Sequence, residues 1–392
     1  MYQIGIDIGK LKHCACVCDS ESGETLVEPF FFENNDTGYK LLISKISLYK
    51  RKKHLIGMED TGHYNLDLLE YLLDQGYKVA LINPKVTDLE RRTLGKSSKN
   101  DKIDTLIICK VLLDKDKYRI ASKKDIETNN MRSYTRQHHD LKEQENVLKN
   151  RLQKDIDILF PEFNDLFYSK YSIIYNNIIK SYGASAKLIA KADIRNLRKC
   201  FEYVLQGRRS NLTPEELKEK AKSSIGLNNE ALVIQAKNLI NQIELIESQL
   251  NEIDKKIEEY SKQLNSPISS VKGIGTFGTV SIHSEYGDIL NFTTPDKMIS
   301  FAGVAPYEYQ SGNYKAPTTV ITKKGSKYLR KTLYQVILPV IRSNPTFQEY
   351  YKLKRFQGKS HRCALGHCVR KLIRVIHHLV TTNTTFDPTL LK

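Results

Sequence analysis

The sequence predicts an α/β domain followed by two mainly helical regions. Three observations support this prediction. Short apolar segments alternate with amphipathic ones over residues 1–125. Residues 126–265 are polar and follow a helical period, and residues 266–392 combine glycine turns, further helical patterns and much of the positive charge. A chain of 392 residues is long enough for two or three domains, each with its own core.

The first region is expected to contain a sheet with helices packed on it. Its first three strands follow one another closely, with the turn "DSESGE" between the second and the third, so they should pair antiparallel. Pro84 closes the last strand, "KVALINP". The expected strands are 2–9, 13–19, 24–34, 54–60 and 78–84, and the expected helices are 39–48, 64–77 and 101–113.

The middle region is expected to form long helices. From Leu239 to Leu264, apolar residues recur in alternating steps of four and three, which is the heptad pattern of a coiled coil. An earlier helix is expected to run from Leu141 to Leu159 and to end before Pro161. The two helices could pair as an antiparallel hairpin or with another protomer. Between them, Thr213 is a good N-cap for a helix that starts at Pro214.

The positive charge is concentrated near the C-terminus. The formal net charge is +16, and residues 300–375 hold fifteen Lys and Arg against two acidic residues, a local net charge of +13. Such a surface is typical of a nucleic-acid-binding protein, although a solvated basic face with no partner is the alternative. No stretch of eighteen apolar residues and no basic leader are present, so we expect neither a membrane span nor a signal peptide.

The cysteines favour a reduced, cytosolic protein. Seven cysteines lack a disulfide spacing, and Cys14, Cys16 and Cys18 alternate along one expected strand. A second cluster combines His361, Cys363, His367 and Cys368 within eight residues. Zinc ligation there is a weaker interpretation than an ordinary amphipathic helix, because no second ligand pair is evident.

A glycine turn marks the start of the last region. Gly273 and Gly275 follow Lys272 and lie between two helical patterns. Glycines let a backbone approach phosphate closely, and the N-terminus of the next helix offers free N–H groups. We therefore expect a helix-hairpin-helix that binds the DNA backbone. A tight turn between two core helices is the alternative.

Four carboxylates are candidates for a metal site. Asp7 and Glu59 end two expected strands, and Asp101 and Asp104 share one face of the expected helix after residue 100. Each acid alone is more often structural. Together, they would repel one another unless cations neutralise them, and hard oxygen ligands suit Mg²⁺ or Mn²⁺. Two such ions about 4 Å apart would suit phosphoryl transfer.

These acids lie in three blocks that resemble known motifs. "GIDIGK", "MEDTGHY" and "KNDKIDT" resemble the blocks of the DEDD transposases of the insertion-sequence one-ten family, which is related to the Piv and MooV DNA invertases. The segment "FAGVAPYEYQSGNYKAPTTVITKKGSKYLRKTLYQ" resembles the transposase domain of the same family. The residues that match the first three blocks and their surroundings are Asp7, Lys10, Glu59, Thr61, Gly62, Tyr64, Asn83, Pro84, Asp101 and Asp104.

The resemblance implies a fold for each region. Residues 1–125 would form a RuvC-like domain with an RNase-H-like fold and a catalytic DEDD tetrad that binds metal. Residues 126–265 would be a variable helical or coiled-coil region. Residues 266–392 would be a transposase domain with a helix-hairpin-helix.

The resemblance also implies a serine nucleophile, and the matching residue is Ser311. It would attack a DNA phosphate and form a phosphoserine link, with the acidic site supplied by another domain or protomer. Tyr307, Tyr309 and Tyr314 surround it and are the alternatives that a tyrosine recombinase would use, whereas Ser326 is expected to cap a helix. The nearby cations expected to bind phosphates are Lys323, Lys324, Lys327 and Arg330.

The implied function is a bacterial transposase of an insertion sequence, cytoplasmic and associated with the nucleoid. Its partners would be donor and target DNA, a non-coding bridge RNA that pairs with both, and further copies of the chain in a dimer or tetramer. Three alternatives remain open. They are a RuvC-like metal-dependent junction endonuclease that cuts with water, a site-specific DNA invertase, and a non-catalytic nucleic-acid scaffold.

Overall fold

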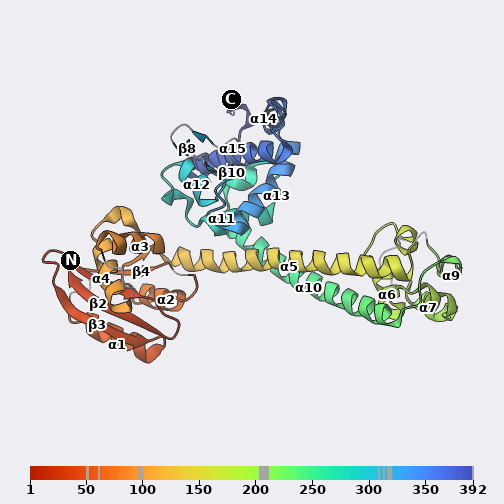
Figure 1. Cartoon of the computed structure of the whole chain (residues 1–392), viewed down its shortest axis with the longest axis horizontal. Helices are drawn as coiled ribbons and strands as arrows, with labels where there is room; N and C mark the ends of the chain where they lie inside the picture. The colour runs from red at the N-terminus through yellow and green to blue at the C-terminus, as the bar shows by residue number, and fades with distance from the viewer. Residues whose placement is uncertain are drawn as a thin grey trace. The chain divides into compact units, whose positions relative to one another are not determined.

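The computed structural model describes residues 1–49, 53–60, 62–95, 100–202, 212–307, 310–311, 314–315 and 320–390. The chain divides into two compact units, residues 1–130 and residues 131–392 (Figure 1). Among the helices of these ranges, none has the length and apolar character needed to cross a membrane.

The first unit is built on a six-stranded mixed sheet with the order β3-β2-β1-β4-β5-β6. The first three strands pair antiparallel, as their spacing predicted, whereas β1, β4 and β5 run parallel and β6 is antiparallel to β5. The strands are β1 Tyr2–Asp7, β2 Lys12–Asp19, β3 Thr25–Glu33, β4 His54–Glu59, β5 Val79–Ile82 and β6 Tyr118–Ile120.

Helices cover both faces of this sheet. α1 (Asp36–Ile46) and α2 (Leu66–Asp74) lie on one face, and α3 (Pro84–Thr93) and α4 (Asp101–Val111) lie on the other (Figure 1). Strand alternation explains how one strand serves both layers, because successive side chains point to opposite faces. In β4, Ile56 packs in the core with α1 and α2, whereas Leu55 packs in the core with α4.

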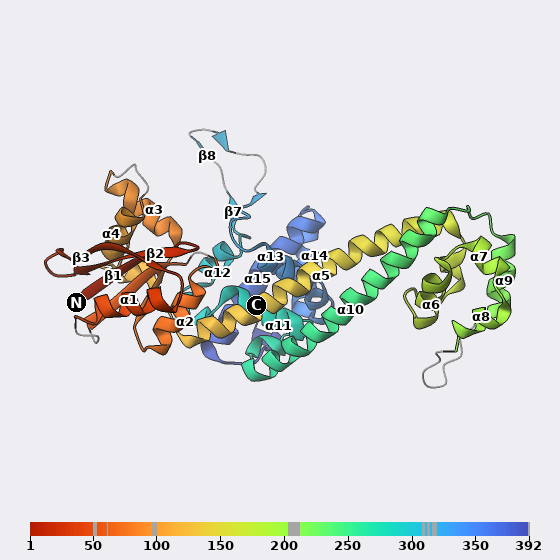
Figure 2. The ribbon, with the colours of Figure 1, turned by 90° about the horizontal axis from the view of Figure 1, so that it is seen from below.

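The second unit contains a long helical hairpin. α5 (Lys123–Leu159) begins in the first unit and continues into the second, and α10 (Glu230–Leu264) returns beside it (Figure 2). The two helices are antiparallel, since Lys149 pairs with Glu247 at 3.1 Å and Asp155 accepts from Gln235 at 3.3 Å. Of the two pairings left open by the sequence, the structure has the one within the chain. Toward the root of the hairpin, their shared buried side chains are Leu141, Ile246, Leu250, Ile253 and Ile257.

Small helices close the far end of this hairpin around a core that includes Phe160, Phe163 and Tyr175. α5 ends at Leu159, just before Pro161, as predicted. Thr213 caps α9 in a reciprocal arrangement with Glu216, so the predicted N-cap is confirmed. The helices are α6 Ile173–Tyr182, α7 Ala186–Lys191, α8 Ile194–Lys199 and α9 Pro214–Ser223.

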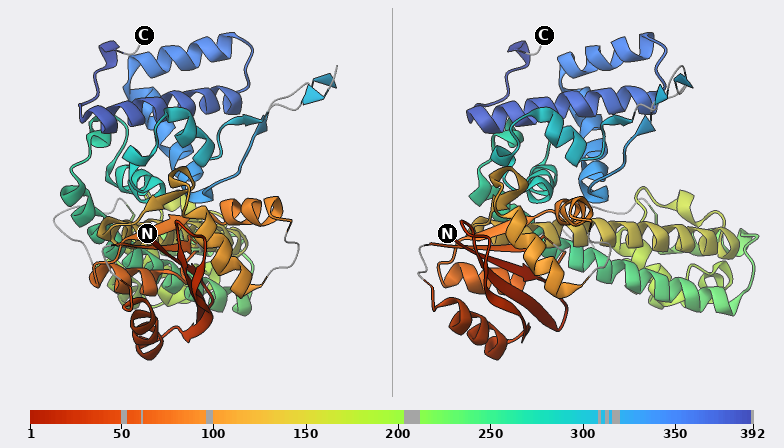
Figure 3. Two further views of the ribbon diagram at one scale, coloured as in Figure 1. Left: turned by 90° about the vertical axis from the view of Figure 1, so that its left-hand side faces the viewer. Right: turned by 60° about the vertical axis from the view of Figure 1, so that its left-hand side comes forward.

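The C-terminal helices form a third core, and α14 and α15 lie side by side in it, in blue in Figure 3. Two short strand pairs accompany them, β7 (Pro306–Tyr307) with β10 (Val320–Ile321), and β8 (Gln310–Ser311) with β9 (Tyr314–Lys315). The helices are α11 Thr276–Tyr286, α12 Pro295–Phe301, α13 Lys327–Ser343, α14 Pro345–Phe356 and α15 His361–Thr382.

Candidate active site and nucleic-acid interface

Asp7 and Glu59 end neighbouring strands at the same edge of the sheet. β1 and β4 are parallel, and their last register pair is Ile6 with Met58, so the next residues along the two strands are these two acids. Both side chains are half-buried. The parallel pairing therefore brings together two acids that are fifty-two positions apart in the chain.

α4 brings the other two acids to this region. Asn100 caps the helix by accepting from the backbone N–H of Lys102 at 2.9 Å, so the helix begins at Asp101. Asp101 is exposed, whereas Asp104 is buried. α4 lies directly on β1, because a Cβ on Gly5 would come within 2.1 Å of the carbonyl oxygen of Thr105.

The negative charges of Asp7 and Asp101 both affect the pKa of one thiol, that of Cys14. Cys14 pairs with Asp7 in the register of β1 and β2. Burial, together with the negative charges of Asp7 and Asp101, raises the pKa of the Cys14 thiol to about 11. A shared influence of this kind requires that both carboxylates lie near Cys14. The end of β1 and the start of α4 are therefore neighbours.

Two of the acids are held by α3. The guanidinium of Arg91 donates to Oδ1 of Asp104 from Nε at 3.0 Å and from Nη2 at 2.9 Å, and it also bonds Asp88 at 3.2 Å. The hydroxyl of Thr87 hydrogen-bonds Oε1 of Glu59. Arg91 and Asp104 are both nearly buried, with side-chain exposures of 11% and 5%, so the cation offsets the cost of burying the carboxylate. The sequence reasoning did not identify Thr87 or Arg91.

The acidic side chains have the chemistry of a metal site but are not gathered around one point. In the described ranges, the group of three potential ligands with ligand atoms within 4.8 Å of one another consists of cysteines, not of these acids. The donor set of carboxylate oxygens still fits a hard cation such as Mg²⁺ or Mn²⁺. Asp7, Glu59 and Asp101 could hold such an ion, and Asp104 could join them by exchanging Arg91 for it.

Other residues of the matched blocks surround this edge. Lys10 is exposed in the loop after β1, and Gly62 has a positive φ of 66°. Asn83 caps α3 by accepting from the N–H of Lys85 at 3.0 Å, with Pro84 at the first helical position. Tyr64 is partly exposed, and Thr61 lies outside the described residues.

The backbone of Ser311 lies in a short hairpin of the second unit. Ser311 is the last residue of β8 and pairs with Tyr314 in β9. The side chains of both residues lie outside the described part of the structure, and so does all of Tyr309. Tyr307, in β7, is half exposed.

The basic residues after this hairpin divide into two kinds. Lys323, Lys324 and Lys327 are exposed around the start of α13. Arg330, in contrast, points back and donates to the carbonyl oxygens of Ala302 at 3.4 Å and Lys323 at 3.5 Å. Its guanidinium therefore supports the loop that presents the lysines.

Ser326 caps the N-terminus of α13, as predicted. Its hydroxyl accepts from the backbone N–H of Leu329 at 3.2 Å. A helix N-terminus with exposed lysines beside it is favourable for phosphate.

The two glycines of the turn differ in their surroundings, since Gly273 packs against α13 and Gly275 has no neighbour among the described residues on its Cβ side. Gly273 has φ of 105°, and a Cβ there would lie 2.6 Å from the backbone nitrogen of Val340 in α13. Gly275 is the N-cap of α11 and has open space around it, and Lys272 is exposed. The alternative of a turn between packed helices thus accounts for Gly273. The turn follows a short 3-10 helix, Pro267–Ser270, and the helix-hairpin-helix stays a prediction.

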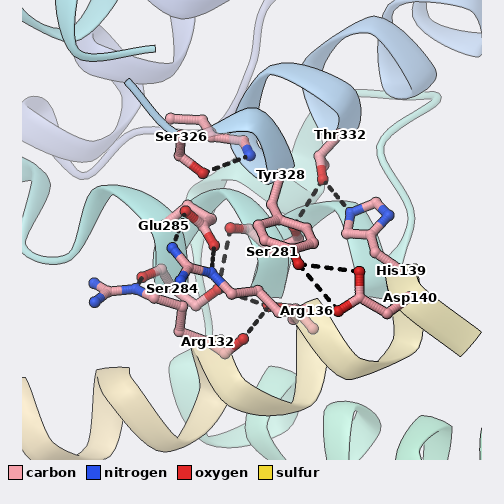
Figure 4. Close-up of polar contacts among 12 residues, drawn as sticks. Arg132, Arg136, His139, Asp140, Ser281, Ser284, Glu285, Ser326, Tyr328 and Thr332 are labelled. Carbon is pink, nitrogen blue, oxygen red and sulfur yellow. Dashed lines mark hydrogen bonds and ion pairs between the residues drawn. The ribbon is translucent and has the colours of Figure 1, made fainter. Parts of the chain in front are cut away.

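An ion pair and a hydrogen bond join the root of the hairpin to α11 (Figure 4). Arg136 of α5 forms a two-pronged ion pair with Glu285 of α11, at 2.6 and 3.0 Å, and Glu285 is only 1% exposed. Arg132 donates to the backbone oxygen of Ser284 at 2.8 Å. These contacts fix where α11 sits along α5.

Hydrogen bonds between α5 and α13 complete this junction. The hydroxyl of Tyr328 donates to Asp140 with distances of 3.0 Å to both carboxylate oxygens. His139 Nε2 lies 2.8 Å from the hydroxyl of Thr332, which also meets Ser281 at 2.8 Å (Figure 4). The sequence reasoning missed this network, because its residues are spread over three segments without a local motif.

The His and Cys residues of α15 have other partners. His361 bonds the hydroxyl of Tyr351 at 2.8 Å, and His367 bonds Arg370 at 3.1 Å. Cys363 is exposed, whereas Cys368 is fully buried in the core. These four residues do not form a metal-ligating group within the described ranges. The amphipathic helix predicted for this segment is present as α15.

Comparison with known proteins gives matches at both ends of the chain. A family model of IS110 transposases, described as "Transposase", matches residues 4–161, and a second, described as "Transposase IS116/IS110/IS902 family", matches residues 265–352. The pilin gene-inverting proteins of Moraxella bovis and Moraxella lacunata are each 22% identical over 389 residues, which are 98% of this chain and 97% of theirs.

A third relative matches over a shorter segment. The insertion element IS900 uncharacterized 42 kDa protein of Mycobacterium paratuberculosis is 26% identical over 157 residues, which are 38% of each chain. Two family models, both of IS110 transposases, match separate parts of the chain. The chain belongs to the IS110 family of insertion-sequence transposases.

Proposed function

We propose that this protein is a DNA recombinase that excises and inserts its own element by metal-dependent strand cleavage and exchange. The observation that carries the proposal is the arrangement of the four acids. Asp7 and Glu59 end adjacent parallel strands, and the helix that bears Asp101 and Asp104 lies directly on the first of them.

The four carboxylates would be the ligands of Mg²⁺ or Mn²⁺. When bound, such an ion supplies a Lewis acid for phosphate oxygens and a template for the attacking group. The protein would hold the carboxylate oxygens in position for the ion. The Arg91–Asp104 pair keeps Asp104 fixed and its charge offset while the ion is absent.

Ser311 would be the nucleophile. Its Oγ would form a bond to a backbone phosphorus of DNA, the bond from that phosphorus to one deoxyribose oxygen would break, and the proton of the serine would pass to a carboxylate acting as base. The leaving sugar oxygen takes up a proton. Attack by the hydroxyl of another strand on the phosphoserine then releases Ser311 and seals the new junction. The acids and the serine could come from different protomers of a homo-oligomer.

The basic C-terminal surface would hold the nucleic acids. Lys323, Lys324 and Lys327 are exposed at the start of α13, and Lys272 and Gly275 flank the N-terminus of α11. Such groups contact phosphates and carry no sequence information by themselves. A bridge RNA that pairs with donor and target DNA would supply the sequence specificity, as in other RNA-guided enzymes.

A site-specific invertase is the second candidate. The relatives that extend over 98% of this chain are named pilin gene-inverting proteins. An invertase would use the same two sites, and it would differ in acting on two sites within one DNA molecule. The RuvC-like endonuclease remains the candidate in which water replaces Ser311.

The test is an assay of sealed junctions and of protein–DNA adducts. The gene with its native flanking DNA is placed on a plasmid beside a candidate target, and wild type is compared with Asp101→Ala and Ser311→Ala. We expect junctions and a covalent adduct in wild type, and neither in the two variants. The matched controls are Asp116→Ala, an exposed acid of the same unit, and Ser326→Ala, a helix cap, and both should retain the adduct.

Other outcomes would select other mechanisms. Cleavage that persists in Ser311→Ala would favour the endonuclease, and an adduct that disappears only in Tyr307→Phe would favour a tyrosine nucleophile. Full activity of Asp101→Ala would show that the acids are structural. Flanking DNA that is inverted in place, with no new insertion, would favour the invertase.

A further inference from the structure

Three buried thiols come together between the sheet and α4 of the first unit. Cys16 and Cys18 lie on β2, and Cys109 lies on α4. Their sulfur atoms all lie within 4.8 Å of one another, and the sulfurs of Cys16 and Cys109 are 3.6 Å apart. The three residues are 0%, 7% and 3% exposed.

Local structure explains why the thiols converge. Cys16 and Cys18 are two positions apart on one strand, so their side chains point to the same face of the sheet. That face is the one covered by α4, which comes very close to β1 beside it because Gly5 has no side chain. Cys109 projects from α4 into the same space, with its thiol 3.6 Å from the carbonyl oxygen of Gln3.

We propose that Cys16, Cys18 and Cys109 form a binding site for a thiophilic d¹⁰ cation, Zn²⁺ or Cu⁺. Soft thiolate ligands select these ions and discriminate against Mg²⁺ and Mn²⁺. Three sulfurs at about 2.3 Å from one ion lie roughly 4 Å from one another, so the observed spacing needs only small adjustments. The site is separate from the four acids, whose oxygens suit hard cations.

The number of ligands that the site offers distinguishes the two ions. A structural Zn²⁺ site is four-coordinate, and here the carbonyl oxygen of Gln3, 3.6 Å from the sulfur of Cys109, is a candidate for the fourth ligand. Cu⁺ is satisfied by three sulfurs and needs no fourth group. The coordination number and the oxidation state of the metal in the loaded protein therefore decide between them.

An ion at this site would link β2 to α4. α4 also begins with Asp101 and bears Asp104, so the ion would hold the helix that carries half of the acidic tetrad. Binding to the folded state alone stabilises a protein in proportion to the logarithm of the free ion concentration over its Kd. The proposal therefore predicts a thermal shift as well as a spectroscopic signal, and neither depends on recombination activity.

The test uses the full-length reduced protein with the exposed thiol removed by Cys363→Ala. Cd²⁺ is titrated as a spectroscopic probe, because thiolate-to-cadmium charge transfer absorbs in the near ultraviolet and carboxylates give no such band. We expect the band to saturate at one ion per chain. Zn²⁺ and Cu⁺, added separately, should displace Cd²⁺ with the same stoichiometry and raise the unfolding midpoint.

Matched variants assign the signal. Cys109→Ala and Cys18→Ala should each lose the saturable band and the thermal shift. Cys14→Ala, on the same face of β2, and Cys368→Ala, a buried thiol of the second unit, should retain both. Asp101→Ala should also retain both, since the acids are not ligands of this ion.

Two results would overturn the proposal. One is a folded, reduced Cys363→Ala protein, with Cys16, Cys18 and Cys109 intact, that shows no saturable band up to a large excess of Cd²⁺. This result would make the three thiols ordinary core residues. The other is a band that survives in Cys109→Ala or disappears in Cys368→Ala. Because the first result is read on the unsubstituted cluster, it does not depend on whether a variant folds.

Discussion

Replacing Gly5 by alanine should separate α4 from β1 and disable the acidic site. A Cβ at this position would lie 2.1 Å from the carbonyl oxygen of Thr105 and 3.0 Å from the sulfur of Cys109. The oxygen belongs to the backbone, so it cannot rotate away as a side chain could. Because Thr105 follows Asp104, the turn that must move is the one that bears the acids.

The required movement can be worked out from the contact distance. A carbon–oxygen contact of at least 3.0–3.4 Å has to be restored from 2.1 Å, so α4 must move outward by about 1 Å. Forcing an extra methyl group into a packed core costs about 1–3 kcal/mol of folding free energy. A misplacement of about 1 Å at a catalytic group can lower the rate by about 100-fold.

Gly57→Ala is the matched control on the neighbouring strand. The three atoms nearest to its Cβ would be side-chain atoms of Leu112 and Ile108, at 2.8–3.0 Å, and these can adjust. Urea unfolding and the junction assay should therefore show a larger loss for Gly5→Ala in both measurements. Equal stability and equal activity of the two variants would refute the reasoning that the close approach of α4 positions the acids.

Three further predictions concern the second unit. Burial lowers the pKa of His139 and of His283 to about 4, so the unfolded chain takes up protons before the folded chain as the pH falls below 6.5. At pH 5 each histidine should therefore lower the unfolding free energy by about 2 kcal/mol. His139→Gln should flatten the pH dependence of stability measured by urea unfolding. Arg136→Met leaves the carboxylate of Glu285 buried without its cation and should cost about 2–3 kcal/mol, less than a fully buried pair because Arg136 is 42% exposed; adding Glu285→Gln should restore part of the loss. Ile243→Ala removes a fully buried side chain from the hairpin core and should lower the unfolding free energy by about 3 kcal/mol, and a loss below 1 kcal/mol would contradict the packing.

The sequence predicts the larger elements of the first unit because their patterns are strong. The strands are apolar runs or alternating segments, and α4 has a clear cap and a buried face. α3 was missed because it is polar nearly all round and buries only Thr87. β6 was missed because three residues, Tyr118–Ile120, are too few for a periodic signal. Both elements are defined by tertiary packing more than by local preference.

The same distinction applies to the site. The placement of Asp7 and Glu59 at one edge of the sheet could be predicted because each ends a strand, and the ends of parallel strands meet at one edge; their role as metal ligands stays a prediction. Arg91 could not be predicted, since it lies on the helix that was missed and its partner Asp104 is thirteen residues away. The close approach of α13 to Gly273 could not be predicted from the sequence either, because Val340 of α13 lies more than sixty residues later in the chain.

The junction at the root of the hairpin determines where this family member can change in length. Arg136, His139 and Asp140 all contact α11 or α13, so a residue inserted among them would rotate some of these side chains away from their partners. Beyond the junction, α5 and α10 meet mainly through a repeating apolar seam. Paired insertions of seven residues in both helices would preserve that seam and lengthen the hairpin by about 10 Å. The far end of the hairpin is thus free to diverge in reach while the base keeps its register.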